Sequence, residues 1–201
     1  MIPALVVVSA YLLGAIPFGF LLVKWKTGRD VRASGSGNIG ATNVLRTTGR
    51  AAAVVTLLLD IGKGVAAVWL ADRLTGGNAT WMSAAAVAVM AGHAYPVFLR
   101  FRGGKAVASF VGAYLYLTPL ALLAVMIVFV ATVARTRYIS LGSILAAGTF
   151  PLAVWLILRP PLPILPAASA SGAFIVYRHR ENIARLRAGK EHGFTFGSRP
   201  R

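Results

Sequence analysis

The fold is decided by one uncharged stretch, Ala106–Ala134, which has the sequence AVASFVGAYLYLTPLALLAVMIVFVATVA. It is longer than the roughly 20 residues that cross a bilayer as a helix, and Thr118-Pro119 lies near its middle. Because proline seldom continues a helix interior, the stretch is predicted to form two short helices with a turn at this dipeptide. One long, tilted helix is the alternative.

The whole chain has the composition of a membrane protein. Of its 201 residues, 57% are hydrophobic, 13% are charged and none is cysteine, whereas soluble domains contain roughly 25% charged residues. A soluble, disordered or coiled-coil protein is therefore excluded, and so is thiol chemistry. Outside the opening stretch, long apolar runs with few charges predict the spans Met1–Val23, Ala51–Ala71, Ala79–Leu99, Tyr138–Leu158 and Pro160–Tyr177.

Positive charge is concentrated between these spans. Eighteen of the 21 Lys and Arg residues fall in four clusters, within 24–50, 100–105, 135–137 and 178–201. The positive-inside rule places all four in the cytoplasm, so an even number of crossings must separate successive clusters. The sequence thus predicts an all-α, polytopic membrane protein with seven transmembrane helices, an N-terminus outside and a cytoplasmic C-terminus. Residues 1–201 are expected to form a single integral membrane domain, with a cytoplasmic glycine-rich loop at 28–50 and a cytoplasmic basic tail at 178–201.

Four polar segments fall on the predicted cytoplasmic face. The first is Ser34–Asn43, with the sequence SGSGNIGATN. Its glycines allow backbone N–H groups to face one point and its side chains add donors, so it is expected to bind phosphate or carboxylate. Arg46 follows and can clamp phosphate oxygens. The match of Gly35, Gly37 and Gly40 to the dinucleotide fingerprint is rejected, because no strand precedes it. A flexible connecting loop is the alternative.

The second segment runs from His93 to Lys105. Gly103 and Gly104 stand directly before Lys105, and a double glycine at a helix start is expected to expose backbone N–H groups beside a cation, again suited to an anion. Arg100 is explained by interfacial anchoring alone. His93 lies on an apolar helix near the interface, where it is either a core hydrogen-bond donor or a site residue.

The third and fourth segments lie later in the chain. Ser140 and Ser143 are one turn apart at a predicted helix start, which indicates helix capping or ligand binding. The fourth segment begins Arg178-His179-Arg180-Glu181-Asn182 and opens a basic amphipathic stretch suited to anionic lipid. Glu181 is an acid among bases, so it is expected to pair with Arg178, Arg180 or Lys105.

Asp60 and Lys63 are charged residues inside a predicted span. Intramembrane charges commonly mark functional sites, but these two are three residues apart on one helix and are expected to neutralise each other. Gly62 and Gly64 beside them would let another helix approach closely.

The residue inventory favours phosphate chemistry. Only five Asp and Glu residues occur in the chain, and they are scattered, so paired-carboxylate catalysis and a site for hard divalent metals are not expected. Several cations and many neutral donors suit electrostatic stabilisation of developing negative charge. We expect no cofactor, no metal and no nucleic-acid partner. A transporter of organic phosphates and a lipid-binding scaffold are the alternatives to an enzyme.

The four segments together resemble the bacterial acyl-phosphate:glycerol-3-phosphate acyltransferase family, PlsY. The matching stretches are Ser36–Asn43, Gly92–Lys105, Ser140–Ser143 and His179–Asn182, and the resemblance extends to about Glu191. It implies acyl transfer from acyl phosphate to the 1-hydroxyl of glycerol 3-phosphate, giving lysophosphatidic acid and phosphate, the first acylation of phospholipid biosynthesis. It also implies a multi-pass protein of the bacterial inner membrane, in contact with membrane lipid, whose active site faces the cytoplasm.

The resemblance and the polar segments together assign roles to individual residues. Hydroxyl deprotonation is assigned either to a histidine or to the departing phosphate. Where the family is expected to have glycine and threonine after the lysine, this chain has Ala106 and Ser109, which affects the fine geometry. The predicted catalytic residues are Ser36, Lys105, His179 and Asn182, and the predicted substrate-binding residues are Gly37, Asn38, Thr42, Asn43, Arg46, His93, Gly103, Gly104, Ser143 and Glu181.

Overall fold

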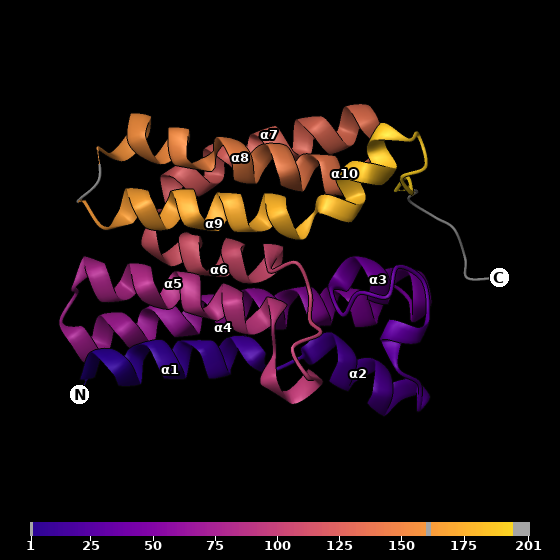
Figure 1. Cartoon of the computed structure of the whole chain (residues 1–201), viewed down its shortest axis with the longest axis horizontal. Helices are drawn as coiled ribbons and strands as arrows, with labels where there is room; N and C mark the ends of the chain where they lie inside the picture. Colours follow the sequence, from indigo (N-terminus) through magenta and orange to yellow (C-terminus); the bar gives the residue numbers. More distant parts are fainter. Residues whose placement is uncertain (1, 160–161, 195–201) are drawn as a thin grey trace. The chain divides into compact units, whose positions relative to one another are not determined.

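The computed structural model describes residues 2–159 and 162–194, and every regular element in this part of the chain is a helix (Figure 1). The all-α prediction is thereby confirmed for these residues. Met1, Pro160 and the end of the predicted tail, 195–201, lie outside the described residues. The chain forms two compact units, Met1–Leu117 and Thr118–Arg199, and each is considered by itself. The single domain predicted for 1–201 remains a prediction.

Unit 1 is built on four helices that pack against one another, α1, α4, α5 and α6. The polar loops that concern function connect these helices at one end, together with shorter elements. In chain order the elements are α1 (Ile2–Ala15), α2 (Phe18–Thr27), η1 (Val31–Ala33), α3 (Ala41–Thr47), α4 (Arg50–Thr75), α5 (Ala79–Ala94), η2 (Val97–Leu99) and α6 (Val107–Leu117).

The first predicted span is interrupted at Ile16-Pro17. Pro17 has φ −93° and ψ 70°, outside the helical region, and it has no N–H to continue the helix. The break frees the Ile16 carbonyl from the regular helical pattern, and this oxygen accepts a hydrogen bond from Lys63 Nζ at 3.0 Å. Lys63 therefore gives this carbonyl a second hydrogen bond, beside the one that it accepts from Phe18 N at 3.2 Å.

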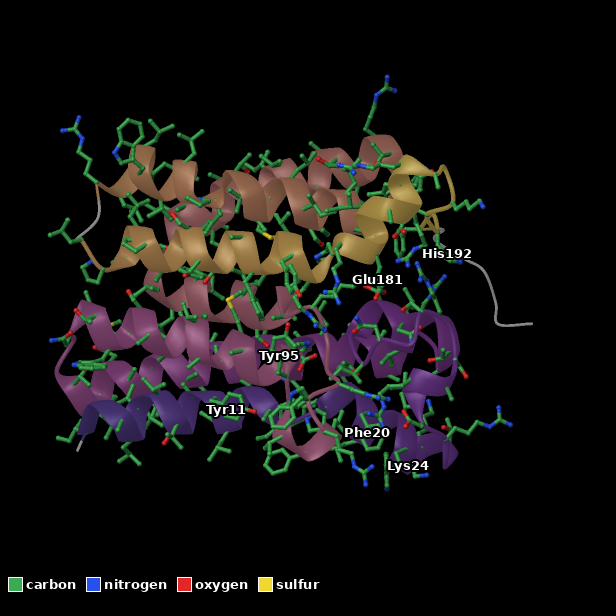
Figure 2. All side chains as sticks on the ribbon, in the orientation of Figure 1. Tyr11, Phe20, Lys24, Tyr95, Glu181 and His192 are labelled. Atoms are coloured by element: carbon green, nitrogen blue, oxygen red, sulfur yellow. The ribbon has the colours of Figure 1, made fainter. Side chains whose placement is uncertain are left out.

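Small residues allow the helices of unit 1 to approach closely, as expected in membranes. A Cβ added at Gly14 on α1 would overlap the backbone of Val89 on α5, and one at Gly64 on α4 would overlap Ser109 on α6. The close approach predicted at Gly64 is confirmed, whereas Gly62 has open space around it. Near the end of α5, the Tyr11 hydroxyl donates to the carbonyl of Tyr95 at 2.8 Å (Figure 2).

The described residues of unit 2 form four helices. Their bounds are α7 (Pro119–Thr136), α8 (Ile139–Leu158), α9 (Ile164–Arg178) and α10 (Arg180–Arg187), and α8 packs against both α7 and α9. The uncharged stretch Ala106–Ala134 forms two helices rather than one, because α6 ends at Leu117 and α7 begins at Pro119. The helix break at Thr118-Pro119 is confirmed.

Five helical segments among the described residues are long and apolar enough to cross a membrane. They are Ala4–Thr27, Arg50–Thr75, Ala79–Leu99, Pro119–Thr136 and Ile139–Leu158. Helix α6 has 11 residues and α9 has 15, which correspond to about 16 Å and 22 Å at about 1.5 Å per residue, against a hydrocarbon core of about 30 Å. Seven crossings and the sidedness of the termini therefore stay predictions.

Candidate functional site

Two of the four polar segments meet at one end of unit 1. Leu99, at the end of η2, belongs to a buried apolar cluster with Ile39 and Val44 of the glycine-rich loop 28–50, and Val31 of η1 lies in the same cluster. These contacts bring the loop after α5 next to the glycine-rich loop, as the charge pattern predicts.

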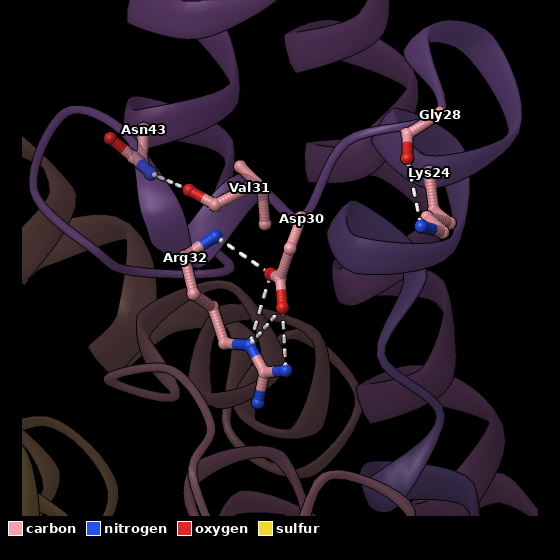
Figure 3. A network of polar contacts seen from close by, with 6 residues as sticks. All are labelled: Lys24, Gly28, Asp30, Val31, Arg32 and Asn43. Carbon is pink, nitrogen blue, oxygen red and sulfur yellow. Dashed lines mark hydrogen bonds and ion pairs between the residues drawn. The ribbon is translucent and has the colours of Figure 1, made fainter.

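Asn43 holds the glycine-rich segment in a fixed conformation. Its side chain is 1% exposed, and its Nδ2 donates to the carbonyls of Val31, Ser34 and Asn38 at 3.1, 3.1 and 2.8 Å (Figure 3 shows the first). Its Oδ1 accepts from Ser36 N at 2.8 Å. The segment is therefore an ordered structure rather than a flexible connector. The side-chain amide of Asn43 forms its hydrogen bonds within that structure.

The glycine-rich segment also presents donors that it does not use itself. Ser36 is exposed, and Thr42 and Arg46 lie one turn apart on α3, with Arg46 exposed. Among the described residues, none of these three side chains has a hydrogen bond or ion pair. Gly37 turns the chain with φ +68°, and the Asn38 Oδ1 accepts from Gly40 N at 2.9 Å. The result is a group of hydroxyls and one guanidinium on a rigid backbone.

Two other cations of the same cluster, Arg32 and Lys24, are already engaged. Arg32 contacts both oxygens of Asp30, with Nη2 to Oδ2 at 2.7 Å (Figure 3). This hydrogen bonding lowers the pKa of Asp30, since it outweighs the opposing effect of partial burial. Lys24 Nζ donates to the carbonyl of Gly28 at 2.8 Å. Arg46 thus differs from Arg32 and Lys24 in having its charge available for a ligand.

The loop before α6 folds back on the end of α5. Gly103 N donates to the Ala94 carbonyl at 3.2 Å, and Gly104 N donates to the His93 carbonyl at 3.0 Å. The expectation that these N–H groups face an anion is therefore wrong. Glycine is needed for another reason: a Cβ at either position would overlap α5 residues, the His93 ring in the case of Gly104. The two glycines shape the approach of Lys105, which is half-buried.

This loop contains left-handed backbone at non-glycine residues. Arg100, Phe101 and Ala106 have φ values of 53°, 62° and 62°, a region that costs side-chain-bearing residues energy. Ala106 stands where the resemblance predicts glycine, and its backbone conformation is one that glycine favours. Strained residues of this kind concentrate at functional sites, where the surrounding structure holds them.

A buried polar cluster lies beneath the loop. Lys63 Nζ is 2.8 Å from Asp60 Oδ1, with both side chains almost completely buried, so the predicted neutralising pair is confirmed. The His93 Nδ1 lies 3.5 Å from the same Asp60 oxygen and 3.3 Å from Ser109 Oγ. The sequence did not predict the contact between His93 and Asp60, because the two residues lie on different helices, α5 and α4.

In unit 2, the third and fourth polar segments meet at a carboxylate that sequence reasoning missed. Glu191 accepts from Ser140 Oγ at 2.8 Å, from Asn182 Nδ2 at 2.6 Å and from Arg185 Nε at 2.8 Å. Burial raises the pKa of Glu191, but the three hydrogen bonds outweigh that effect and lower it. Glu181, which was expected to be paired, is exposed and forms no ion pair with the described residues (Figure 2). Glu191 could have been identified from sequence because it, too, is an acidic residue in a basic tail.

Two further predicted residues of unit 2 are buried at helix ends. His179 joins α9 to α10, is 3% exposed, and its Nδ1 lies 2.8 Å from the Ile175 carbonyl. Because a carbonyl oxygen only accepts, Nδ1 carries a proton, and in the neutral ring Nε2 is the basic nitrogen. Ser143 Oγ donates to the carbonyl of Ile139 within α8 at 3.0 Å.

Comparison with known proteins gives consistent results over most of the chain. The family model described as glycerol-3-phosphate acyltransferase matches residues 4–189. A glycerol-3-phosphate acyltransferase of Geobacter sulfurreducens is 46% identical over 92% of this chain and 94% of its own, and one of Geotalea daltonii is 46% identical over 94% and 95%. The crystal structure of PlsY, an integral membrane glycerol 3-phosphate acyltransferase, in its glycerol 3-phosphate form has a TM-score of 0.91 and 39% identity, with 96% of each chain covered. Its lysophosphatidic acid form gives 0.88 and 38%, with 96% of this chain and 95% of that chain covered.

Proposed function

Because the chain belongs to the glycerol-3-phosphate acyltransferase family, we propose that it transfers an acyl group from acyl phosphate to the 1-hydroxyl of glycerol 3-phosphate. The products are lysophosphatidic acid and inorganic phosphate. Family membership makes the chain a membrane-embedded acyltransferase of phospholipid biosynthesis. The acyl-phosphate donor, the seven crossings with an external N-terminus, and a site facing the cytoplasm of the inner membrane are parts of the proposal.

The observation that carries the proposal is the group of donors on the glycine-rich segment. Ser36, Thr42 and Arg46 have no hydrogen bond or ion pair with the described residues, although the backbone beneath them is locked by Asn43. Donors on a preorganised backbone bind an anion without first having to be ordered. A phosphate group offers several acceptor oxygens to such a set, and arginine contacts two of them at once. We assign Gly37 and Asn38 to the shape of this phosphate site.

Lys105 supplies the second positive charge. The hydrogen bonds that Gly103 and Gly104 donate to α5 set the direction in which the chain reaches Lys105. A fixed ammonium group stabilises negative charge that develops during reaction better than one that must reorganise. We assign Lys105 to the leaving phosphate and to the oxyanion of the tetrahedral intermediate.

Residues of unit 2 complete the assignment. The Asn182 Nδ2 donates to Glu191, which fixes the amide plane and hence the direction of its Oδ1. We assign Asn182 and His179 to orienting the acceptor hydroxyl and the reacting carbonyl, and Ser143 and Glu181 to substrate binding. These four roles rest on the family motif together with the burial of His179, Asn182 and Ser143.

The reaction balances without a cofactor. The 1-hydroxyl oxygen of glycerol 3-phosphate attacks the carbonyl carbon, and the bond from that carbon to the phosphate oxygen breaks as the tetrahedral intermediate collapses. The hydroxyl proton passes either to Nε2 of His179, which can accept it because Nδ1–H is bound to Ile175, or to the departing phosphate.

The test is formation of lysophosphatidic acid by the purified chain from acyl phosphate and labelled glycerol 3-phosphate. We expect Lys105→Ala and Asn182→Ala to abolish product formation. We expect Arg46→Gln to raise the KM for a phosphate substrate by on the order of tenfold or more, because a charge-assisted contact is lost.

Arg32→Gln is the matched control for Arg46→Gln. It removes a guanidinium from the same loop that is already bound to Asp30, so KM should change little. Full activity in both alanine variants would disprove the site assignment. Glycerol 3-phosphate entering liposomes unchanged, without acyl phosphate, would favour transport instead.

A further inference from the structure

The imidazole of His93 lies between the buried polar cluster around Asp60 and the loop before α6. On its Nδ1 side are the Asp60 carboxylate at 3.5 Å and the Ser109 hydroxyl at 3.3 Å. On its other side, the edge bearing Nε2 and Cδ2 lies against Gly104, so closely that a Cβ there would overlap it. The residue His93 as a whole is 3% exposed. It therefore fills the space between the buried cluster and the loop.

The buried end of this arrangement is firmly held. Asp60 is fixed by Lys63 at 2.8 Å, and Lys63 is fixed in turn by the Ile16 carbonyl at 3.0 Å. Two opposite charges in an apolar environment attract each other strongly, and separating them is costly. The pair thus provides a rigid support for one nitrogen of the His93 ring.

The loop end is held by the same residue. The His93 carbonyl accepts from Gly104 N at 3.0 Å, and its ring lies where a Cβ on Gly104 would be. Gly104 precedes Lys105, and Ala106 after it has left-handed backbone with φ 62°. A displacement of the His93 ring therefore moves Gly104 and changes the direction of Lys105.

We propose that His93, supported by Asp60 and Lys63, is a positioning residue that sets the Gly104–Lys105 backbone for binding substrate phosphate. This inference rests on the proposed function, in which Lys105 binds phosphate. His93 acts through the loop, and its buried ring does not itself contact substrate. The intramembrane charges Asp60 and Lys63 then support the site from beneath.

Two substitutions separate the two sides of the ring. Asparagine at this position, His93→Asn, can place an amide where Nδ1 lies and keep the contact to Asp60 and Ser109, but it leaves the Gly104 side empty. Glutamine, His93→Gln, is long enough to reach the Nε2 position. Ser83→Ala is the control, because Ser83 is a buried polar residue on the same helix, far from the loop.

The experiment uses the full chain purified in detergent, with acyl phosphate and glycerol 3-phosphate as the probes. For His93→Asn, we expect the KM of at least one phosphate substrate to rise on the order of tenfold, since the charge-assisted contact between Lys105 and phosphate is weakened. We expect kcat to fall as well, because Lys105 is also assigned to the oxyanion of the tetrahedral intermediate, and His93→Gln to recover most of the affinity. The thermal midpoint should remain close to that of Ser83→Ala. The substrate whose KM rises identifies the phosphate that the loop holds.

Unchanged KM values for both substrates in His93→Asn, with an active wild type, would overturn the inference and leave the proposed function standing. A fall in thermal midpoint with unchanged KM would assign a structural role only and would also overturn it. Absence of lysophosphatidic acid formation by the wild type would overturn the proposed function and this inference together.

A double-mutant cycle gives a second measurement. Gly104→Ala introduces a methyl group at a position that the His93 ring occupies in the structure. If the ring acts through Gly104, the losses of His93→Asn and Gly104→Ala are not additive, because both displace the same backbone. Losses that multiply as independent effects would contradict the inference.

Discussion

Asn43→Ala tests whether the glycine-rich segment is preorganised. The amide of Asn43 has two hydrogens that donate to carbonyls of the segment and one oxygen that accepts from Ser36 N. Removal of about three hydrogen bonds, at about 1 kcal/mol net each, lowers the free energy for local opening by about 3 kcal/mol. That change makes opening about 100-fold more frequent, provided that the segment opens as a unit.

Hydrogen–deuterium exchange of the detergent-solubilised protein measures this opening directly. We expect amides within residues 31–42 to exchange about 100-fold faster in Asn43→Ala, and the KM for a phosphate substrate to rise with them. Thr47→Val is the matched control on the same short helix, since it removes the hydrogen bonds of Thr47 Oγ1 to the Asn43 carbonyl at 3.0 Å and with Thr48 Oγ1 at 3.3 Å but leaves the Asn43 amide intact. Wild-type exchange in Asn43→Ala would refute the reasoning, because the segment would then be held by other contacts.

Three further predictions concern strain, titration and buried charge. Ala106→Gly should raise the thermal midpoint, since relief of left-handed backbone strain is worth about 1 kcal/mol; an unchanged or lower midpoint would show that the φ of 62° carries no strain. The pKa of Glu191 is lowered in the fold, so its stabilisation is complete above the ordinary glutamate pKa and is lost as pH falls through the lowered value; Glu191→Gln should flatten this acid-side slope in a plot of thermal midpoint against pH, and an unaltered slope would contradict it. Lys63→Met should destabilise the protein by about 3 kcal/mol, since it leaves the buried Asp60 carboxylate without its lysine partner, and adding Asp60→Asn should recover part of the loss in the same thermal assay; no recovery would show that the pair is not the cause.

Features that depend on neighbouring residues in the chain could be predicted from sequence. The helix break at Thr118-Pro119 follows from proline itself, and the Asp60–Lys63 ion pair follows from helical spacing. The break at Pro17 had the same local signal, but the surrounding apolar run concealed it.

Features that depend on contacts between distant elements could not be predicted. The use of the Gly103 and Gly104 N–H groups by α5 requires knowing that the loop folds back on that helix. The sequence does not show whether Glu181 or Glu191 is the hydrogen-bonded acid. That depends on how the chain folds back after α10, which brings Glu191 to Ser140 and Asn182. The sequence shows which segments are polar, but it does not distinguish donors that bond within the fold from donors that do not.

Measurement of the acyl donor tests the central claim most directly. The purified chain is given labelled glycerol 3-phosphate with either an acyl phosphate or the acyl-CoA of the same chain length, and lysophosphatidic acid and inorganic phosphate are quantified together. We predict lysophosphatidic acid and phosphate in equal amounts from acyl phosphate, and no product from acyl-CoA. Product from acyl-CoA at a comparable rate, or no product from acyl phosphate, would contradict the account.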